Sequence, residues 1–305
     1  MITVVYSFDR NYAHYAAVST YSLALHSRSA LRIVWVIPAD DLEHIAPVAA
    51  NLEVEVELRP VEPGEFSAWK ASHHFSQAMY LRLLIPSLIH EPRAIYLDAD
   101  TLVLSDLAAL HAVDLGNNLL AGVPDPAGAQ SSRVPRQCGD PYLNSGMLLM
   151  NLDALRNDNM LEKAKAIYCE YENELAWPDQ CVINKYAEGR KITLDVKWNR
   201  QISAFDITEA QFDSVLSESG LAVLHFVDSV KPWHKWCNPS VGDFYWRYAD
   251  RARIDGLKPQ EITTIDQAML FARVLDHNAR FQEASMLKQR IIESLLGSQD
   301  SDSIA

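Results

Sequence analysis

The hydrophobic and polar positions at the start of the chain form short apolar runs separated by segments of helical spacing. Ile2 to Tyr6 is a β-branched run, and Asn11 to His26 then repeats apolar and small residues with helical periodicity. Two more apolar runs, Leu31 to Ile37 and Val54 to Leu58, enclose a helix that one of the aspartates at 40 and 41 could cap. This βαβαβ order predicts an α/β fold with a mostly parallel, doubly wound sheet.

The same alternation continues through the middle of the chain. Further strands are predicted at Ala94 to Leu97, Leu119 to Val123, Ser145 to Met150 and Ala222 to Phe226. Further helices are predicted at Ser76 to Ile89, at Leu152 to Asn173 and from Trp177 onwards. Pro86 should bend or end the first of these helices. The segment from Pro124 to Pro141 is rich in Pro, Gly, Ser and Arg, and we expect a mobile loop there.

The character of the sequence changes near Lys258. From Pro259 to Leu296 the pattern is that of two amphipathic helices, and a polar tail follows whose composition does not favour order. The apolar positions of these helices include Ile265, Met269, Phe271, Val274 and Phe281. We therefore expect an α/β domain over residues 1–258 and a helical appendage over 259–305. The appendage could pack on the first domain or join two copies of the chain as a homodimer.

Composition narrows the class of protein. With 305 residues, 49% of them hydrophobic, the chain can bury a large core. The formal net charge of −13 and the lack of a Lys/Arg cluster argue against nucleic acid and against an anionic membrane surface as partners. The apolar runs fall far short of the ~20 residues of a membrane-spanning helix. The four cysteines form no C-x-x-C pair and follow no apolar leader, so we expect reduced thiols in a cytoplasmic protein, with at most peripheral contact at the inner face of a membrane.

Asp98-Ala99-Asp100 directly follows one of the predicted strands. Side chains two residues apart in extended backbone lie on one face, so both carboxylates point the same way, and the small Ala99 between them permits close approach. Two neighbouring carboxylates repel each other unless a cation joins them. Open α/β sheets bind ligands at the carboxyl ends of their strands. The alternative is an ordinary polar turn that leads into a short helix.

His225 also lies in an apolar run and could complete an Asp/Asp/His metal site. A mixed set of oxygen and nitrogen ligands favours Mn²⁺ or a similar ion over Ca²⁺, with Mg²⁺ also possible. Lys231 offers a point charge for phosphate, with Trp233 to pack beside it. The alternative for His225 is a hydrogen-bonded histidine of the core. The other histidines weighed carry no stronger case: His73, His74 and His234.

Arg82 and the pair Asp179-Gln180 form a third group of candidates. A buried arginine could clamp a phosphate or a sugar, and Asp and Gln commonly bind sugar hydroxyls through hydrogen bonds. Their alternatives are a surface ion pair and a helix N-terminal cap. The chain contains none of the sequence signatures of dinucleotide, P-loop, zincin or serine-hydrolase sites.

Six short motifs occur in an order that resembles glycosyltransferase family 8, in particular its bacterial lipopolysaccharide galactosyl- and glucosyltransferases. The first follows the first predicted strand, where Asp9-Arg10-Asn11-Tyr12 is similar to the family's D-x-N-Y segment. That segment contacts uracil and ribose, so the resemblance implies nucleoside binding by four residues: Ser7, Asp9, Asn11 and Tyr12.

The second and third motifs concern the donor and the metal. Tyr80-Leu81-Arg82-Leu83 places Arg82 at the position of the family's donor-contacting arginine. Tyr96-Leu97-Asp98-Ala99-Asp100 resembles the family's Y-L-D-x-D metal motif. The resemblance implies that Asp98, Ala99 and Asp100 lie against the donor and that the two aspartates hold the metal with His225.

The remaining motifs lie in the second half of the chain. Asn144-Ser145-Gly146-Met147 is similar to the N-x-G segment beside the donor sugar, and Asp179-Gln180 with Asn184 looks like D-Q-D-x-x-N. His225 through Trp233 looks like H-x-x-G-x-x-K-P-W. These matches imply donor contacts for Asn144, Asp179, Gln180 and Lys231.

The chain departs from the family pattern at two positions. Cys181 replaces the second acid of D-Q-D, and Asp228 replaces the glycine of H-x-x-G-x-x-K-P-W. The second change adds negative charge near the expected diphosphate and puts the backbone contact of that glycine in doubt. Arg10 could offset part of this charge.

The resemblance implies a GT-A fold and transfer of galactose or glucose, with retention, from UDP-galactose or UDP-glucose to a glycan or glycoconjugate, with Mn²⁺ or Mg²⁺. Arg82 and Asp179 would orient the sugar, and the Gln180 carbonyl would face its reacting carbon. Because no protein nucleophile stands out, we expect front-face attack by the acceptor rather than double displacement. Two alternatives remain. A sugar-nucleotide pyrophosphorylase would carry a Gly-rich N-terminal signature, which residues 1–12 lack, and a non-catalytic UDP-sugar-binding protein would bind without turnover.

Overall fold

The structure is a computed structural model that describes residues 1–62, 64, 66, 68–70 and 76–297. The chain falls into two compact units. The first comprises Met1–Arg200 and Gly220–His225, and the second comprises Gln201–Ser219 and the chain from Phe226 onwards. This division differs from the predicted one at Lys258, which remains a prediction. The predicted polar tail beyond residue 297, His73 and His74 lie outside the described residues.

The first unit is built on a seven-stranded sheet in the order β3-β2-β1-β4-β7-β6-β8. Its strands are β1 (Ile2–Ser7), β2 (Leu31–Pro38), β3 (Val56–Val61), β4 (Arg93–Leu97), β6 (Leu120–Pro124), β7 (Leu143–Asn151) and β8 (Lys191–Thr193). β1 pairs in parallel with β2 and β4, as do β2 with β3 and β6 with β8. Only β7 runs antiparallel to both neighbours, β4 and β6. The prediction of a mostly parallel sheet in an α/β fold is confirmed.

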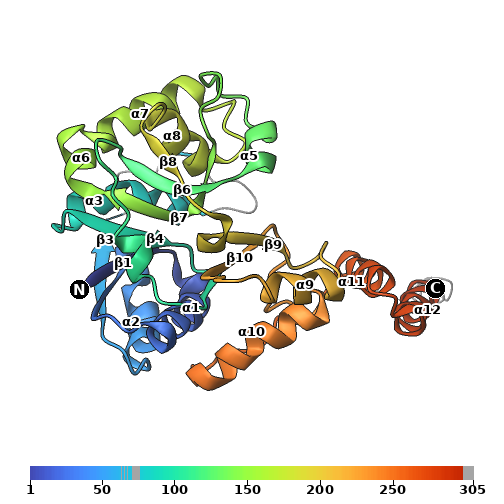
Figure 1. Cartoon of the computed structure of the whole chain (residues 1–305). Helices are drawn as coiled ribbons and strands as arrows, with labels where there is room; N and C mark the ends of the chain where they lie inside the picture. Colours follow the sequence, from blue (N-terminus) through green and yellow to red (C-terminus); the bar gives the residue numbers. More distant parts are fainter. Residues whose placement is uncertain (63, 65, 67, 71–75, 298–305) are drawn as a thin grey trace. The chain divides into compact units, whose positions relative to one another are not determined.

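The two faces of the sheet are covered by different helices (Figure 1). On one face, Trp35 donates a hydrogen bond to Thr20 and Tyr6 accepts one from Ser19, both in α1 (Ala13–His26). On the other face, alternate residues such as Val34 join a core with the helices that follow β3 and β7. Strands buried on both faces read as continuous apolar runs, which is the pattern of β1 and β2 in the sequence.

The remaining helices of the first unit are shorter. They are η1 (Arg10–Tyr12), η2 (Ala39–Asp41), α2 (Leu42–Ala50), η4 (Gln77–Leu84), α3 (Ile85–Leu88), α4 (Ala108–His111), α5 (Pro126–Ser131), α6 (Leu152–Asn157), α7 (Met160–Tyr171), α8 (Pro178–Tyr186) and η5 (Val196–Trp198).

A second sheet of three strands has the order β5-β10-β9. Its strands are β5 (Thr101–Val103), β9 (Arg200–Ser203) and β10 (Val223–Val227). β10 runs antiparallel to β5, and this register sets His225 opposite Thr101, the residue that follows Asp100. The pairing therefore brings a histidine from late in the chain beside the aspartates at 98 and 100.

The second unit is mainly helical and contains α9 (Glu209–Leu216), α10 (Pro239–Ala252), α11 (Ile265–His277) and α12 (Phe281–Gly297). Asn238 caps α10 and donates to Ile207 O at 2.7 Å and Asn278 Oδ1 at 3.2 Å, which ties α10 and α11 together. Val274 is buried, whereas Ile265, Met269 and Phe281 are exposed. Among the described residues, no helix has the length and apolar character needed to cross a membrane.

Several predicted helices differ in detail from the structure. Residues 77–84 form a 3-10 helix and residues 85–88 form the short α3, with Pro86 in its first turn, in place of one long helix. The helix expected at 152–173 breaks around Asn159, whose φ of 54° is left-handed. The expected loop at 124–141 contains α5, because Asp125 caps its first turn. Asp41 occupies the N-cap position of α2, but its side chain makes no capping hydrogen bond and accepts from the Arg10 N–H instead.

Candidate active site

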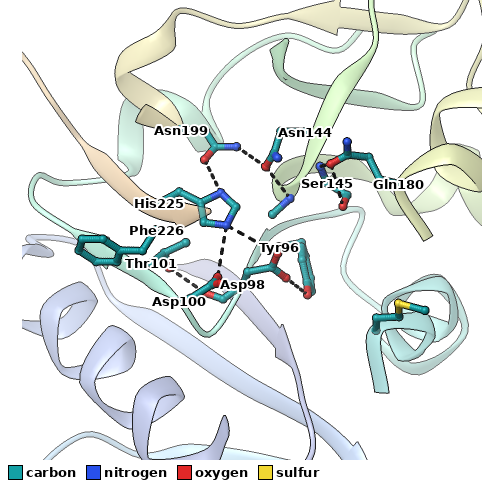
Figure 2. A network of polar contacts seen from close by, with 12 residues as sticks. Tyr96, Asp98, Asp100, Thr101, Asn144, Ser145, Gln180, Asn199, His225 and Phe226 are labelled. Carbon is teal, nitrogen blue, oxygen red and sulfur yellow. Dashed lines mark hydrogen bonds and ion pairs between the residues drawn. The ribbon is translucent and has the colours of Figure 1, made fainter. Parts of the chain in front are cut away.

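Three side chains with metal-ligand chemistry meet at the carboxyl end of β4. The Asp98 N–H donates to Gly146 O at 2.8 Å, which sets Asp98 beside the start of β7. The ligand atoms of Asp98, Asp100 and His225 all lie within 4.8 Å of one another. His225 Nε2 is 3.2 Å from Asp100 Oδ1 and 3.9 Å from Asp98 Oδ2. Figure 2 shows this group, with the histidine approaching from β10 and the aspartates from the loop after β4.

Asp98 is held on its other side by two donors. Arg82 Nη2 lies 2.8 Å and the Tyr96 hydroxyl 2.5 Å from Asp98 Oδ1. Burial raises the pKa of Asp98 and so does the Asp100 carboxylate, while Arg82 opposes this shift. Burial likewise raises the pKa of Tyr96, so its phenol stays a proton donor. One oxygen of Asp98 is thus fixed, and the other faces His225.

Arg82 is buried at the centre of a polar network. Its Nε donates to Met79 O at 2.9 Å, and its Nη1 lies 3.1 Å from both Ser145 O and Asp179 Oδ2. Burial lowers the pKa of Arg82, but the carboxylates of Asp179 and Asp98 outweigh that effect, so its pKa lies above the ordinary value. The surface ion pair considered for Arg82 is therefore not what the structure contains.

Asp179 and Gln180 project from the first turn of α8 into the same network. Ser145 Oγ donates to Asp179 Oδ2 at 3.1 Å, and the Ser145 N–H donates to Gln180 Oε1 at 2.9 Å. The Gln180 amide then donates through Nε2 to Asp125 Oδ2 at 3.0 Å. Asp179 is buried and is not the N-cap of α8, which is Trp177.

The predicted nucleoside residues follow the carboxyl end of β1. Ser7 Oγ lies 3.2 Å from the Tyr96 hydroxyl, which joins it to the Asp98 network. Asp9 caps η1 by accepting from the Asn11 N–H at 2.9 Å. Burial raises the pKa of Tyr12, and the carboxylates of Asp100, Asp9 and Asp98 add to this effect.

The other predicted residues are distributed as follows. Ala99 is buried between the two aspartates, and Asn144 Oδ1 accepts from the Gly146 N–H at 3.0 Å. Lys231 belongs to the second unit, where its ammonium donates to Phe226 O at 2.7 Å.

The side chains of Asp98, Asp100 and His225 suit a divalent metal ion. Asp98, Asp100 and Asp179 bring three carboxyl groups beside the single guanidinium of Arg82, and a bound cation would relieve the repulsion between neighbouring carboxylates. Two carboxylates and an imidazole form a mixed oxygen and nitrogen set, which Mn²⁺ and similar ions accept. Two of these side chains, His225 and Asp98, pack closely against the backbone at Gly146.

The two departures from the family pattern have structural explanations. Cys181 is a buried free thiol 3.0 Å from the Tyr142 hydroxyl, in a small apolar cluster with Val134. Asp228 adopts φ of 69°, the left-handed conformation that glycine adopts most readily. The backbone shape expected of a glycine is therefore kept at residue 228.

Two residues of the network were not expected from the sequence. Asp125 follows β6, whose end lies beside the start of β7, so the rule that ligands bind where strands end could have found it. Asn199 contacts Asn144 and His225 across 55 and 26 residues of sequence, and no local signal marks it.

Comparison with known proteins identifies the family of this chain. A family model described as glycosyl transferase family 8 matches residues 3–237. The chain belongs to glycosyl transferase family 8. The resemblance of its motifs to that family is thereby confirmed, and the chain is a glycosyltransferase by family.

Curated relatives and solved structures agree with this assignment. Lipopolysaccharide 1,2-glucosyltransferase of Escherichia coli is 29% identical over 257 residues, covering 79% of this chain and 75% of the relative. A putative glycosyltransferase of Haemophilus influenzae is 25% identical over 262 residues, covering 82% and 79%. The galactosyltransferase LgtC, solved in complex with donor and acceptor sugar analogs, superposes with a TM-score of 0.71 at 23% identity, covering 84% of this chain and 97% of that one. The fold is of the GT-A type.

Proposed function

We propose that this family member transfers galactose or glucose, with retention of configuration, from a UDP-sugar to a glycan or glycoconjugate, and that it requires Mn²⁺ or Mg²⁺. The observation that carries the proposal is the meeting of Asp98, Asp100 and His225 beside the Arg82–Asp179 ion pair. Bound there, a divalent ion would stabilise the negative charge of the departing diphosphate.

The residues around the metal ligands supply orientation. Arg82 is held by Asp98, Asp179 and the Ser145 carbonyl, so its side chain is positioned before any donor arrives. Such preorganised charge lowers the barrier because no reorganisation is needed during the reaction. Asp179, held in turn by Ser145 and Arg82, is placed to accept hydrogen bonds from a sugar.

Retention is proposed to occur by front-face attack of the acceptor, with the Gln180 carbonyl stabilising the oxocarbenium-like carbon. Gln180 Oε1 accepts from the Ser145 N–H, and a carbonyl oxygen has a second lone pair for the sugar. Asp125 holds the amide nitrogen of Gln180 on the opposite side, so the carbonyl cannot rotate away without losing both contacts. The role of Lys231 at the diphosphate rests on the motif resemblance.

The proposal is tested by a screen of UDP-sugars with Mn²⁺ in which released UDP is measured. UDP-galactose or UDP-glucose should release UDP slowly with water and faster with a glycan acceptor, and chelation with EDTA should stop both. Tight UDP binding without turnover across varied acceptors would favour the non-catalytic UDP-sugar-binding protein. Formation of a UDP-sugar from UTP and a sugar phosphate would favour the pyrophosphorylase.

Two further expectations belong to this proposal. A cytoplasmic location, with peripheral contact at the inner membrane face, would suit a lipid-linked glycan acceptor. A homodimer through the C-terminal helices would cover exposed apolar side chains, of which Phe281 is 64% and Ile265 46% exposed.

A further inference from the structure

The ring of His225 has a partner on the side away from the aspartates. His225 Nδ1 lies 3.0 Å from Asn199 Oδ1, while Nε2 faces Asp98 and Asp100. Asn199 is fully buried and His225 nearly so. Buried polar atoms of this kind are normally hydrogen-bonded to other protein atoms. The neighbouring contacts therefore decide whether His225 Nδ1 or the Asn199 amide is the donor.

A backbone group decides the direction of these hydrogen bonds (Figure 2). The Gly146 N–H can only donate, so the Asn144 atom 3.0 Å away is the carbonyl oxygen. Asn199 meets that same oxygen at 2.9 Å and must offer its NH₂ group to it. The other end of the Asn199 amide, which faces His225, is then the carbonyl oxygen. An oxygen can only accept, so His225 Nδ1 must carry the proton.

We propose that Asn199 is a positioning residue that accepts a hydrogen bond from His225 Nδ1–H and so fixes the ring with Nε2, the ligand atom, facing Asp98 and Asp100. A neutral imidazole has one N–H and one lone pair, and only the lone pair can bind a metal ion. The opposite tautomer would direct an N–H at the metal position and set the lone pair of Nδ1 against that of Asn199 Oδ1. The chain of hydrogen bonds from Gly146 through Asn144 and Asn199 to His225 therefore orients the His225 ring before a metal ion binds.

The expected effect on metal affinity rests on the proposed function. The hydrogen bond between Asn199 and His225 does not. Outer partners of metal-binding histidines commonly change metal affinity by roughly 10- to 100-fold when removed. The contact of His225 Nδ1 with Asn199 Oδ1 is present in the metal-free protein, so the proton on Nδ1 can be detected whether or not the chain uses a metal. This separates failure of the inference from failure of the proposed function.

The first experiment determines the tautomer. Protein labelled with ¹⁵N-histidine and freed of metal with EDTA is examined by long-range ¹H–¹⁵N correlation near pH 8, and His225 is assigned by comparison with His225→Ala. A protonated Nδ1 is expected, as the contact with Asn199 Oδ1 requires. An unprotonated Nδ1 in the wild-type protein would overturn the proposal, even if Mn²⁺ binds and sugar is transferred.

The second experiment compares two variants at residue 199. Asn199→Ala removes the acceptor and should give a mixed tautomer with roughly 10- to 100-fold weaker Mn²⁺ binding, measured by water proton relaxation. Asn199→Asp keeps an acceptor for the Nδ1–H but removes the donor to Asn144 Oδ1, so it should retain the protonated Nδ1 and more of the Mn²⁺ affinity than Asn199→Ala. The matched control is Asn238→Ala, which removes another buried amide, one bonded to Ile207 and Asn278, and should leave Mn²⁺ affinity unchanged.

The outcomes are distinct. Loss of Mn²⁺ affinity in Asn199→Ala with an unchanged tautomer, or equal losses in Asn199→Ala and Asn238→Ala, would overturn the positioning role. If Asn199→Ala does not fold, the wild-type tautomer and the behaviour of Asn199→Asp still decide the question. Absence of Mn²⁺ and Mg²⁺ binding in the wild-type protein, with the Nδ1–H tautomer present, would count against the proposed metal dependence alone.

Discussion

A methyl group at Gly146 would lie 2.2 Å from His225 Cε1, far inside the contact distance of two carbon atoms. The same methyl group would lie 2.7 Å from Asp98 Oδ2. The backbone of β7 therefore passes directly against two of the proposed metal ligands, and only a residue without a side chain can occupy this position. The glycine of the N-x-G motif is explained by this close approach.

Gly146→Ala should consequently displace His225 from Asp98 and Asp100. We expect loss of Mn²⁺ affinity by at least about 10-fold and a loss of stability of about 1 to 3 kcal/mol from overpacking. Isothermal calorimetry and urea unfolding measure the two effects. The control is Gly122→Ala, whose added methyl meets the flexible Leu148 side chain at 3.1 Å. Wild-type Mn²⁺ affinity in Gly146→Ala would contradict the site geometry.

Asp98→Asn and Asp100→Asn each remove a carboxylate oxygen from the proposed metal site. Sugar transfer should fall by about 100-fold or more, because metal ligation contributes several kcal/mol to charge stabilisation, and Mn²⁺ affinity should fall with it. Initial rates over a Mn²⁺ series measure both. Asp114→Asn, which alters an exposed carboxylate that caps the Gly116 N–H, is the matched control. Unchanged metal-dependent transfer in either site variant would rule out the proposed ligands.

Much of the first unit could be predicted because its strands are buried on both faces. β1, β2 and β4 are continuous apolar runs that end at polar residues, so periodicity locates them and the parallel topology brings their ends together. That is why Ser7 and Asp98 could be expected at one edge of the sheet. Residues 77–84 were harder, since a 3-10 helix of eight residues has no distinctive apolar spacing.

The contacts that connect the site residues could not be predicted in the same way. Asn199 contacts His225 because β9, which directly follows it, lies beside β10, and it contacts Asn144 near the start of β7. Neither arrangement leaves a local trace around residue 199. Similarly, Asp125 meets Gln180 across 55 residues of sequence. Composition and spacing identify which residues could do chemistry, whereas the tertiary structure decides which of them support one another.

His234 should make the protein less stable in mild acid. The Lys231 N–H donates to His234 Nδ1 at 3.1 Å, and burial together with the Lys231 charge lowers the pKa of His234 to about 4. The pKa of His234 is higher in the unfolded chain, so the unfolded chain takes up the proton first as the pH falls. The free energy of unfolding is therefore highest above pH ~6.5 and decreases as the pH falls towards 4.

Urea unfolding of the wild type and His234→Gln from pH 7.5 to 4.5 tests this expectation. The stability difference between the two proteins should shrink by roughly 1 to 2 kcal/mol as the pH falls, after allowance for partial exposure of the ring. Carboxylates elsewhere titrate equally in both proteins and cancel in the comparison. A constant difference across this range would mean that His234 does not titrate as expected.

The exposed apolar residues of α11 and α12 test the proposed homodimer. The double variant Ile265→Ser, Phe281→Ser should weaken self-association in sedimentation experiments while changing stability by less than about 0.5 kcal/mol, as is usual for surface positions. Val274→Ala, at a fully buried position of α11, should instead lower stability by roughly 1 to 3 kcal/mol without first dissociating the protein. A wild-type protein that is monomeric at all concentrations would exclude the dimer.

The segment from Pro124 to Pro141 was expected to be a mobile loop, and a loop in this position could close over a bound UDP-sugar. The structure shows contacts that hold part of this segment in place. The Asp140 carboxylate accepts from Lys191 at 2.5 Å and from the Gly189 N–H at 2.9 Å, and Lys185 donates to Pro135 O at 2.9 Å. The Asp140–Lys191 pair is almost completely buried, so breaking it would leave an uncompensated charge. Any closure must therefore involve the part between Asp125 and Val134 more than the part after it.

Hydrogen exchange and limited trypsin digestion test closure of this segment. UDP-sugar with Mn²⁺ should slow amide exchange around α5 and protect Arg133, because a segment closed over the donor excludes water and protease alike. Arg136 should be cleaved slowly even without donor, since it donates to Ala129 O and lies over the Tyr142 ring.

Asp140→Asn should speed exchange after Val134 in the free protein yet leave protection of Arg133 by donor intact. Mn²⁺ alone is the control and should protect neither arginine. Equal cleavage at Arg133 with and without UDP-sugar would mean that this segment does not close, and the residues that exclude water from the donor would then have to lie elsewhere.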